Sequence, residues 1–393
     1  MKNIIPDIIE HLPEFTRWRH DLHAHPELAF DEARTSQFVA EQLQSFGLEV
    51  HTGIGGTGVV ARLSRVDSGK AIGLRADMDA LPMQEQNTFA HKSVYPGRMH
   101  GCGHDGHTVM LLAAAQYLAK HQAFNGTVIF IFQPAEEANE KGSGAAAMIK
   151  DGLFDRFPMD AVFGMHNWPG LPVGHCSIRN GPVMAAMDLF EVNVTGHGTH
   201  GALPHTGIDT VLVCAHIITA WQSIVSRNTD PLDTAVVSAT TVQAGDSWNV
   251  IPHTAVIRGS VRTFNKATQQ RVQQRLQSIA EHIATAMGAS VQISYTNSSP
   301  ANVNDEATAA LALQVAEEVV GADKVLKDDA ALKLMGSEDF AHLSQQVPGV
   351  YLLIGNGDGE GGCMVHEPRY DFNDELIPIG ASYWVRLVEM FLA

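Results

Sequence analysis

Five short runs of large apolar residues, each bounded by glycine, proline or aspartate, constrain the fold of this chain most strongly. Runs of this length are typical of strands buried on both faces of a sheet. Apolar residues recur at helical spacing in 33–46, which stops before Gly47, and in 108–121. Alternating strands and helices predict an α/β domain with a mostly parallel sheet. The runs are VVARL (59–63), AIGLRA (71–76), TVIFIFQ (127–133), DAVFGM (160–165) and VYLLIG (350–355).

Residues 187–298 follow a different pattern. Several stretches here alternate apolar and polar residues, as half-exposed antiparallel strands do. Helices predicted over 208–226 and 266–286 complete a strand-helix-strand-strand-helix-strand order, which suits a ferredoxin-like α+β sandwich. The parallel-sheet pattern resumes after residue 300, so we expect a discontinuous first domain, 1–186 and 299–393, interrupted by a second, 187–298.

Charge and composition limit the partners and the compartment. The chain has 393 residues and a formal net charge of −17 at pH 7, so its surface repels nucleic acid and anionic lipid on average. The start carries Pro6 and Asp7 where a signal peptide needs an unbroken apolar core, and no stretch reaches about 18 apolar residues. The four cysteines form no C-x-x-C pair. We expect a soluble, cytoplasmic protein with no nucleic-acid or membrane partner.

Carboxylates and imidazoles follow four of the five apolar runs. In an open α/β sheet, ligands bind beyond the carboxyl ends of the strands. We therefore expect these side chains to form one polar cluster at that edge. They are Asp77, Asp79, Glu136, Glu137, His166 and His366.

The glycine-rich turn 99–107, MHGCGHDGH, adds Cys102 and His104 to this set. Cysteine, histidine and carboxylates are the ligands of Zn²⁺, Mn²⁺ and Co²⁺. Taken singly, a loop histidine is more often a surface residue, and two adjacent glutamates more often begin a solvated helix. Convergence at one edge favours a metal site instead. Two adjacent glutamates, Glu136 and Glu137, can then divide the work, one binding metal and the other moving a proton.

The second domain offers weaker candidates for substrate binding. Its loop 196–205, GHGTHGALPH, is rich in glycine and histidine, although taken alone a plain turn between strand and helix is the slightly favoured interpretation. Asn249, Arg258 and Arg262 have the chemistry to hold a substrate carboxylate, arginine through two parallel hydrogen bonds. A solvated strand position is the alternative for either arginine.

Eight ordered motifs resemble the M20 family of dinuclear-metal peptidases and amidohydrolases. The resemblance is to its branch of hippurate hydrolases, N-acyl-amino-acid amidohydrolases and auxin-conjugate hydrolases, and it runs nearly end to end. The motifs are RHDLHAHPELAFDE (19–32), LRADMDALPMQE (74–85), MHGCGHDGHTVMLL (99–112), FQPAEE (132–137), GMHNWPG (164–170), GHGTHGALPHTGID (196–209), GSEDF (336–340) and VHEPRYDFND (365–374).

The resemblance implies a metal-binding catalytic domain and an inserted lid or dimerisation domain. Glu136 is the implied general base, and His200 is implied to reach across a dimer and polarise the scissile carbonyl. Asn249 and Arg262 are implied to help hold the substrate's carboxylate, with His205 a neighbouring candidate. The implied metal ligands are Cys102, His104, Glu137, His166 and His366.

One position departs from the wider family, in which a His-x-Asp motif follows the second strand. Asp77 occupies the histidine position here, and Cys102 looks like the replacement ligand. We therefore expect Asp77 and Asp79 to orient the ligands rather than bind metal. Thiolate favours zinc, whereas carboxylate and imidazole also suit manganese. Two divalent ions are expected, Mn²⁺ or Zn²⁺, with Co²⁺ or Ni²⁺ as alternatives.

The implied reaction is hydrolysis of an N-acyl amino acid, of the hippurate or N-acetyl type, to a carboxylic acid and a free L-amino acid. A homodimer or dimer-based oligomer is implied with it. Two alternatives stay open on the same scaffold, a dipeptidase and an N-carbamoyl-amino-acid hydrolase. A third, of another class, is a metal-binding protein without catalysis.

Overall fold

The computed structural model describes residues 3–66, 68–138, 142–327, 333–358 and 363–393. The chain divides into two compact units. The first comprises Met1–Val183, Val303–Lys333 and Asp339–Ala393, and the second Met184–Asn302 and Leu334–Glu338. The second unit therefore includes a short segment after residue 333 that the sequence pattern places in the first domain. This segment joins the second unit because Ala185 N–H lies 3.1 Å from the Leu334 carbonyl oxygen and 2.9 Å from that of Gly336.

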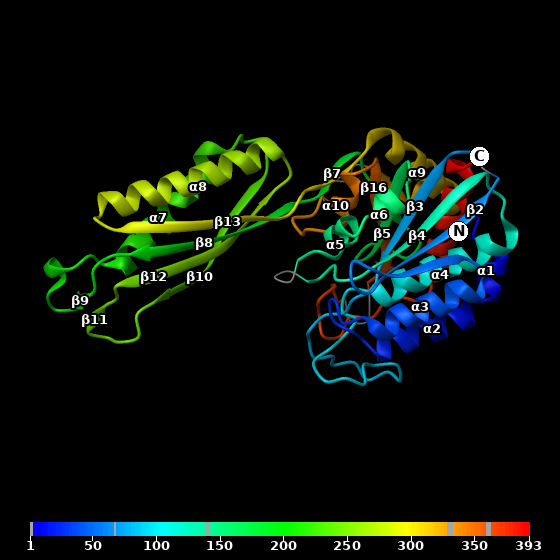
Figure 1. The fold of residues 1–393 in the computed structure, drawn as a ribbon, viewed down its shortest axis with the longest axis horizontal. Helices are drawn as coiled ribbons and strands as arrows, with labels where there is room; N and C mark the ends of the chain where they lie inside the picture. Colours follow the sequence, from blue (N-terminus) through cyan, green and yellow to red (C-terminus); the bar gives the residue numbers. More distant parts are fainter. Residues whose placement is uncertain (1–2, 67, 139–141, 328–332, 359–362) are drawn as a thin grey trace. The chain divides into compact units, whose positions relative to one another are not determined.

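An eight-stranded sheet forms the centre of the first unit (Figure 1). In spatial order its strands are β1 (Glu49–Ile54), β2 (Gly58–Arg65), β4 (Gly126–Gln133), β3 (Ala71–Asp77), β5 (Ala161–Pro169), β16 (Gly349–Gly357), β6 (Cys176–Ile178) and β15 (Val325–Lys327). The central strands β4, β3, β5 and β16 run parallel. Antiparallel pairs join β1 to β2, β2 to β4 and β6 to β16. The predicted mostly parallel α/β sheet is confirmed.

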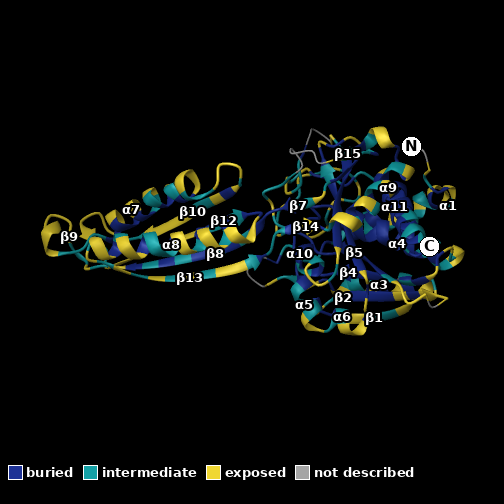
Figure 2. Ribbon diagram, turned by 90° about the horizontal axis from the view of Figure 1, so that it is seen from above, coloured by how far each residue is buried: buried dark blue, intermediate teal, exposed yellow. Residues whose placement is uncertain are grey.

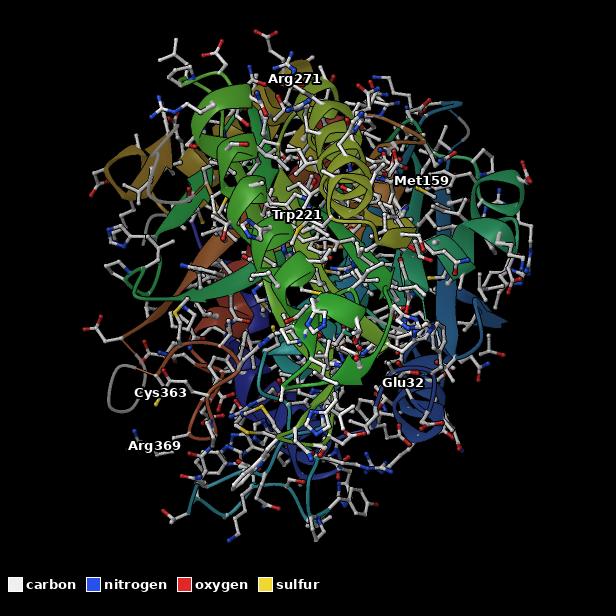
Figure 3. All side chains as sticks on the ribbon, turned by 90° about the vertical axis from the view of Figure 1, so that its left-hand side faces the viewer. Glu32, Met159, Trp221, Arg271, Cys363 and Arg369 are labelled. Atoms are coloured by element: carbon white, nitrogen blue, oxygen red, sulfur yellow. The ribbon has the colours of Figure 1, made fainter. Side chains whose placement is uncertain are left out.

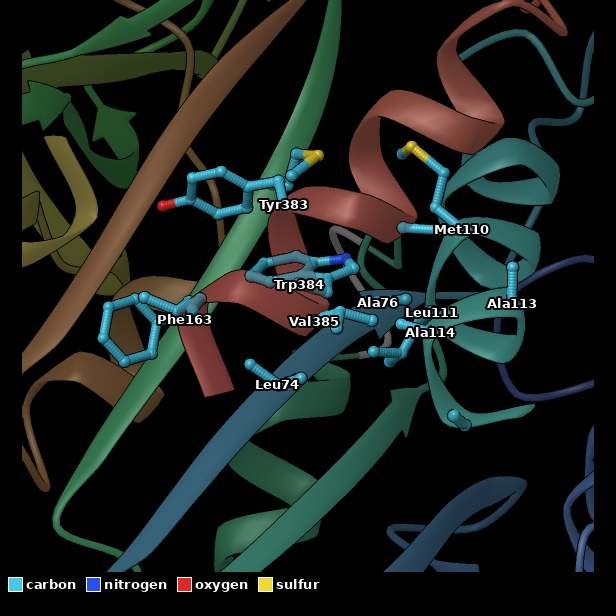
Figure 4. Packing of buried hydrophobic residues seen from close by; sticks show 14 of the residues in the cluster. Leu74, Ala76, Met110, Leu111, Ala113, Ala114, Phe163, Tyr383, Trp384 and Val385 are labelled. Carbon is cyan, nitrogen blue, oxygen red and sulfur yellow. The ribbon is translucent and has the colours of Figure 1, made fainter. Parts of the chain in front are cut away.

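Helices bury the apolar strands of this sheet. Figure 4 shows Leu74 of β3 close to Leu111 and Ala114 of α4 and to Trp384 and Val385 of α11, and all five are buried in one core cluster. Burial on both faces explains why the central strands are continuous apolar runs. The helices of the unit are α1 (Pro6–Glu10), α2 (Leu12–Ala24), α3 (Ala33–Ser45), α4 (His104–His121), α5 (Gly144–Lys150), α6 (Leu153–Arg156), α9 (Glu306–Val319), α10 (Phe340–Ser344) and α11 (Leu376–Phe391).

Helix α4 begins four residues before the predicted start at 108. Its first turn contains His104, Asp105 and His107, all buried, so the apolar pattern used for the prediction misses it. Gly103 precedes the helix with a left-handed φ of 92°, which allows the chain to turn sharply into His104. Among the described residues, no helix is long and apolar enough to cross a bilayer.

The second unit is a four-stranded antiparallel sheet covered by two helices. Its strands, in spatial order, are β10 (Ala235–Ala244), β12 (Thr254–Thr263), β8 (Ala186–Thr195) and β13 (Ser290–Ser299), and its helices are α7 (Thr210–Ser223) and α8 (Lys266–Ala286). Trp221 of α7 packs at a ring distance of 5.2 Å from Phe190 of β8 and donates its indole N–H to the Leu276 carbonyl of α8 at 3.0 Å. Figure 2 shows exposed residues along both helices and buried ones along β8.

The chain order of this unit, β8-α7-β10-β12-α8-β13, is the predicted strand-helix-strand-strand-helix-strand order. The helix predicted over 208–226 begins at Thr210 because the side chain of Asp209 accepts the Leu212 N–H and caps it. It ends as an α-helix at Ser223 and continues as a π-helical segment over Ile224–Asn228. A short two-stranded ladder joins β9 (Thr199–His200) to β11 (Val250–Ile251).

Candidate metal centre

Side chains of the types that bind metals meet in the first unit, near the carboxyl ends of β3, β4 and β5. Cys102 belongs to two groups of ligand atoms that each lie within 4.8 Å of one another, one with His104 and His166 and one with Glu137 and His366. A third such group joins His104 to Glu136 and Glu137. All five residues implied as ligands, and the implied base, therefore lie in one cluster.

Cys102 and His166 are buried side by side in this cluster. Cys102 Sγ lies 3.3 Å from His166 Nε2. His166 Nδ1–H donates to the Asn167 carbonyl oxygen at 2.6 Å, which leaves the Nε2 lone pair facing the sulfur. Burial, with His107 and His104 nearby, holds the pKa of His166 well below its usual range. His166 is therefore neutral at pH 7, which is the form that binds a metal.

The Cys102 thiol lies among negative charges. Burial and the carboxylates of Glu137 and Glu136 raise the pKa of Cys102 well above its usual value. Without a cation this sulfur keeps its proton. A divalent ion reverses that balance, because a coordinating thiol is deprotonated outright. Together with imidazoles and carboxylates, the sulfur completes a donor set that suits a divalent transition metal.

His104 supplies a second imidazole at the same place, with its Nε2 lying 3.8 Å from Asp77 Oδ2. Its Nδ1–H donates to Asp79 Oδ1 at 3.2 Å, whereas its Nε2 is buried and has no hydrogen-bond partner within the described ranges. Burial alone would lower the pKa of His104, but Asp77 and Asp79 outweigh it and raise the pKa to about 10. Without a metal the ring is therefore protonated at pH 7 and supplies the positive charge among these carboxylates; a divalent ion would displace the Nε2 proton and take over that charge. The residues present therefore fit a metal ion.

Asp79, two residues beyond β3, holds two of the implied ligands, His104 and Glu137, and Asp77, the last residue of β3, holds the side chains packed behind them. Asp79 accepts the Glu137 N–H at 2.9 Å through its second oxygen. Asp77 accepts from Arg75 Nη1 at 2.7 Å and from His107 Nδ1 at 2.6 Å. Asp77 also shares a group of possible ligand atoms with His104 and His107. Sequence reasoning missed Arg75 and His107, although Arg75 lies two residues before Asp77 on the same face of β3.

Two residues beside the cluster have backbone angles that L-amino acids rarely adopt. Ala135, directly before Glu136, has φ 52°, and His366 has φ 66°. Such conformations persist only where the surroundings impose them, and they concentrate at functional sites. The His366 N–H donates to the Gly101 carbonyl at 2.7 Å, which ties this ligand to the turn that carries Cys102.

A buried charge network supports the first turn of α4 from the N-terminal helix α2. His23 Nδ1 lies 2.8 Å from Asp105 Oδ2 and its Nε2 lies 3.2 Å from Glu85 Oε1. Arg19 Nη1 lies 3.6 Å from the same Asp105 oxygen. The sequence motif 19–32 had no assigned role, yet Arg19 and His23 are spaced four apart on one helix face. That spacing is the signal in the sequence that could have indicated a shared partner.

The four residues of the second unit to which the resemblance assigns a role separate into two places, whereas the further candidate Arg258 donates to Glu191 Oε2 at 2.6 Å on the exposed face of the sheet. His200 pairs with Val250 across the β9–β11 ladder, and the Gly201 N–H donates to the Asn249 carbonyl at 2.7 Å, so His200 and Asn249 lie together. His205 lies in the exposed short helical turn Pro204–Thr206 that follows. Arg262 lies near the far end of β12, where its Nη1 donates to Ser337 Oγ at 3.1 Å.

Asn249 and Arg262 lie far apart within the second unit. Asn249 precedes β11 and the start of β12 at Thr254, whereas Arg262 is eight residues farther along β12, a rise of about 26 Å at roughly 3.3 Å per residue. The structure therefore brings His200 and Asn249 together and places Arg262 apart from both.

Comparison with known proteins agrees with the chemistry of this cluster. Residues 73–390 match peptidase family M20/M25/M40. The chain belongs to the M20 family. The predicted family membership is confirmed, and the match covers both the strands that carry the cluster and the whole second unit.

Individual M20 relatives are similar along nearly the whole chain. A hippurate hydrolase of Campylobacter jejuni is 41% identical over 390 residues, which cover 99% of this chain and 100% of that protein. An N-acetyl-L-cysteine deacetylase of Bacillus subtilis is 39% identical and covers 93% of this chain, with 85% of its own length matched. This M20 chain is accordingly a metal-dependent amidohydrolase, as predicted.

A solved M20 structure has the same fold. It is described as a dinuclear metal-binding peptidase of Bacillus subtilis and is 33% identical, with a TM-score of 0.85. The match covers 98% of this chain and 99% of that one.

Proposed function

We propose that this enzyme hydrolyses the amide bond of N-acyl amino acids and releases a carboxylic acid and a free L-amino acid. The observation that carries the proposal is the single cluster in which five metal-ligating side chains meet Glu136. A storage or transport site needs the ligands but has no use for an additional carboxylate that can take up a proton. Glu136 beside a full ligand set therefore favours catalysis over metal binding alone.

Two divalent ions would be held by the cluster. Cys102 is common to the two ligand groups, one extending to His104 and His166 and the other to Glu137 and His366. Zn²⁺ and Mn²⁺ suit this mixture of sulfur, nitrogen and oxygen donors, with Co²⁺ and Ni²⁺ as alternatives. When bound, such ions polarise a carbonyl oxygen and lower the pKa of water.

Glu136 moves the proton. Its carboxylate lies within 4.8 Å of ligand atoms of His104 and Glu137, at a position that is only partly buried and so open to a water molecule. Glu136 accepts a proton from the attacking water and donates it to the amide nitrogen as the C–N bond breaks. The amine therefore leaves as a neutral group.

His200 supplies a hydrogen-bond donor. The Ala202 N–H donates to His200 Nδ1 at 3.0 Å, so the proton of the neutral ring lies on Nε2. The ring is exposed, and its Nε2–H is the kind of donor that stabilises negative charge developing on a carbonyl oxygen.

The distances within the second unit favour a site built from two subunits. An N-acyl amino acid is about as long as two extended residues, roughly 7 Å. Arg262 lies about 26 Å along β12 from Thr254, and Asn249 lies outside that strand, beside the β9–β11 ladder that precedes it. The two residues of one subunit are therefore too far apart to contact one such molecule. We propose a homodimer in which His200 and Asn249 come from one subunit and Arg262 from the other.

The substrate class follows from the relatives. Their names specify hippurate and N-acetylcysteine, which share a free carboxylate and an N-acyl group. A dipeptidase and an N-carbamoyl-amino-acid hydrolase are the alternatives on the same scaffold, since they differ only in the group attached to the nitrogen.

A substrate screen of the metal-reconstituted enzyme tests the proposal. Hippurate, N-acetylmethionine, a dipeptide and an N-carbamoyl amino acid are compared after reconstitution with Mn²⁺ and, separately, with Zn²⁺. We expect hydrolysis of one or both N-acyl substrates and its loss after chelation. Preference for the dipeptide or the carbamoyl compound would support an alternative reaction, and two bound metals without any hydrolysis would support the non-catalytic reading.

A further inference from the structure

We propose that Glu32 is a positioning residue that holds the backbone before Glu136 in its strained conformation. This inference depends on the proposed role of Glu136 as the base. Glu32 is the last residue of the motif 19–32 and the residue before α3, and Figure 3 shows it on the N-terminal segment. Among the described residues, Glu32 makes no hydrogen bond to the side chains of the candidate metal centre. We therefore expect it to act on Glu136 through the backbone.

The two carboxylate oxygens of Glu32 have separate partners. Oε1 accepts the Ala135 N–H at 2.9 Å, and Oε2 accepts the hydroxyl of Thr57. The side chain is fully buried, with 0% exposure. Water therefore cannot replace the carboxylate as the acceptor of the Ala135 N–H without a rearrangement of the surrounding side chains.

The restraint acts on a turn that would otherwise relax. Ala135 has φ 52°, a conformation that costs free energy for any residue with a Cβ atom. Besides Glu32, the turn is closed by the Gly144 N–H, which donates to the Ala135 carbonyl at 3.0 Å, and by apolar packing of Ala29 and Phe30 against Ala135 and Ala138. Part of the N-terminal segment thus packs directly on the turn that carries the base.

Glu137, the next residue after Glu136, has restraints that do not involve Glu32. Glu137 is fixed at its N–H by Asp79, at 2.9 Å, and at its carboxylate by His366, also at 2.9 Å. Glu136 directly follows the strained Ala135. Removal of the Glu32 carboxylate should therefore displace Glu136 more than Glu137, so that turnover falls while the metals stay bound.

The first test compares Glu32→Ala with Glu32→Gln. We expect Glu32→Ala to lower kcat at least tenfold, to change KM less than threefold and to keep two metal ions per chain. Glu32→Gln should recover most of the activity, because its amide oxygen still accepts the Ala135 N–H. Equal activity of Glu32→Ala and the unmodified enzyme would overturn the proposal, as would loss of metal in parallel with loss of kcat.

Two variants control for stability and for the second oxygen. Glu27, in the same motif, accepts the N–H groups of Arg34 and Thr35 at the start of α3, at 3.0 and 2.8 Å. Glu27→Ala should lower the melting temperature without lowering kcat. Thr57→Ala removes only the partner of Oε2 and should change kcat less than threefold. A tenfold loss of kcat in Glu27→Ala would show that general loosening, rather than the Ala135 contact, explains the effect.

A double-mutant cycle tests whether Glu32 acts through Glu136. In a Glu136→Gln background, Glu32→Ala should reduce the residual rate less than twofold. A second test adds Ala135→Gly to Glu32→Ala. The double variant should have a kcat several-fold higher than Glu32→Ala alone, because glycine adopts φ 52° without the Cβ penalty.

The outcomes separate this inference from the proposed function. Full activity of Glu136→Gln alone would remove the base and with it the proposed mechanism. Glu136→Gln can instead be nearly inactive, as proposed, while Glu32→Ala still lowers its residual rate tenfold. That result would overturn only the positioning role of Glu32.

Discussion

His104 and Glu137 are linked through Asp79. His104 Nδ1 lies 3.2 Å from Asp79 Oδ1, and the Glu137 N–H donates to Asp79 Oδ2 at 2.9 Å. His104 begins α4 and Glu137 follows β4, so one carboxylate after β3 joins two elements that lie far apart in the sequence. The same bond fixes the His104 tautomer whose Nε2 is available to a metal.

Asp79→Asn should weaken metal binding. An asparagine side chain presents one N–H₂ group, which must face either His104 Nδ1–H or the Glu137 N–H, so one of the two hydrogen bonds is lost. We expect the metal affinity to fall by roughly 10- to 100-fold, measured by competition with a chelator. The control is Asp160→Asn, at the opposite end of β3, where the carboxylate accepts the Ala71 N–H at 2.8 Å. An unchanged metal affinity in Asp79→Asn would contradict the orienting role.

Glu136→Gln should separate metal binding from turnover. Glutamine is nearly isosteric with glutamate but takes up no proton at neutral pH, so a rate loss on the order of 10²- to 10⁴-fold is expected. Metal analysis should still find two ions per chain. Near-normal turnover would remove Glu136 from its role as the base.

Mixing two inactive variants tests the site composed from two subunits. His200→Ala and Glu136→Gln each disable one half of every site in their own homodimers. A heterodimer contains one site with both residues intact, so the mixture should recover up to about a quarter of the normal activity if subunits exchange at random. Subunit exchange is verified with differently labelled chains, and exchange without recovery would mean that His200 acts within its own chain or has no role.

Metal should stabilise the fold. The cluster places Glu137, Glu136 and Asp77 near a buried thiol, and without a cation their charges repel one another. Binding to the native state alone contributes about 2.7 kcal/mol when the free metal is 100 times Kd. We expect the unmodified protein to have a higher melting temperature with Mn²⁺ or Zn²⁺ than with chelator. In Cys102→Ser, this difference between metal and chelator should be smaller. An equal difference in the two proteins would place the stabilising metal elsewhere.

Stability should also depend on the charge of His23. Burial opposes the charged form, but Asp105 and Glu85 outweigh it and raise the pKa of His23 to about 9 from 6.5. A raised pKa in the folded state contributes stability that is complete below about pH 6.5 and disappears as the pH rises through about 9. The contribution is on the order of 3 kcal/mol.

Urea unfolding between pH 6 and 10 measures this effect. The free energy of unfolding should fall more steeply over pH 6.5–9 in the unmodified protein than in His23→Gln. His282→Gln, on the exposed side of α8, serves as the control and should keep the steep dependence. Parallel curves for the unmodified protein and His23→Gln would show that His23 stays neutral when folded.

The strands of the parallel sheet were predictable because each is buried on both faces and so reads as an unbroken apolar run. β3 and β16 match runs 71–76 and 350–355 closely. β6 and β15 were not predicted, since each has three residues and carries no pattern of its own. The start of α4 was missed for another reason, because its buried polar residues are held by distant partners such as Asp77 and Asp79.

The sequence by itself determined the types of donor and their position after apolar strands, and parallel strands bring their ends together by geometry alone. It could not determine which nitrogen of His104 or His166 carries the proton, because that depends on Asp79 and on the Asn167 carbonyl, contacts made only in the folded chain. Nor could it determine the strained φ of Ala135, which Glu32 restrains from more than a hundred residues away in sequence. Residue chemistry is local, whereas tautomer, strain and ionisation are set by neighbours that only the tertiary structure supplies.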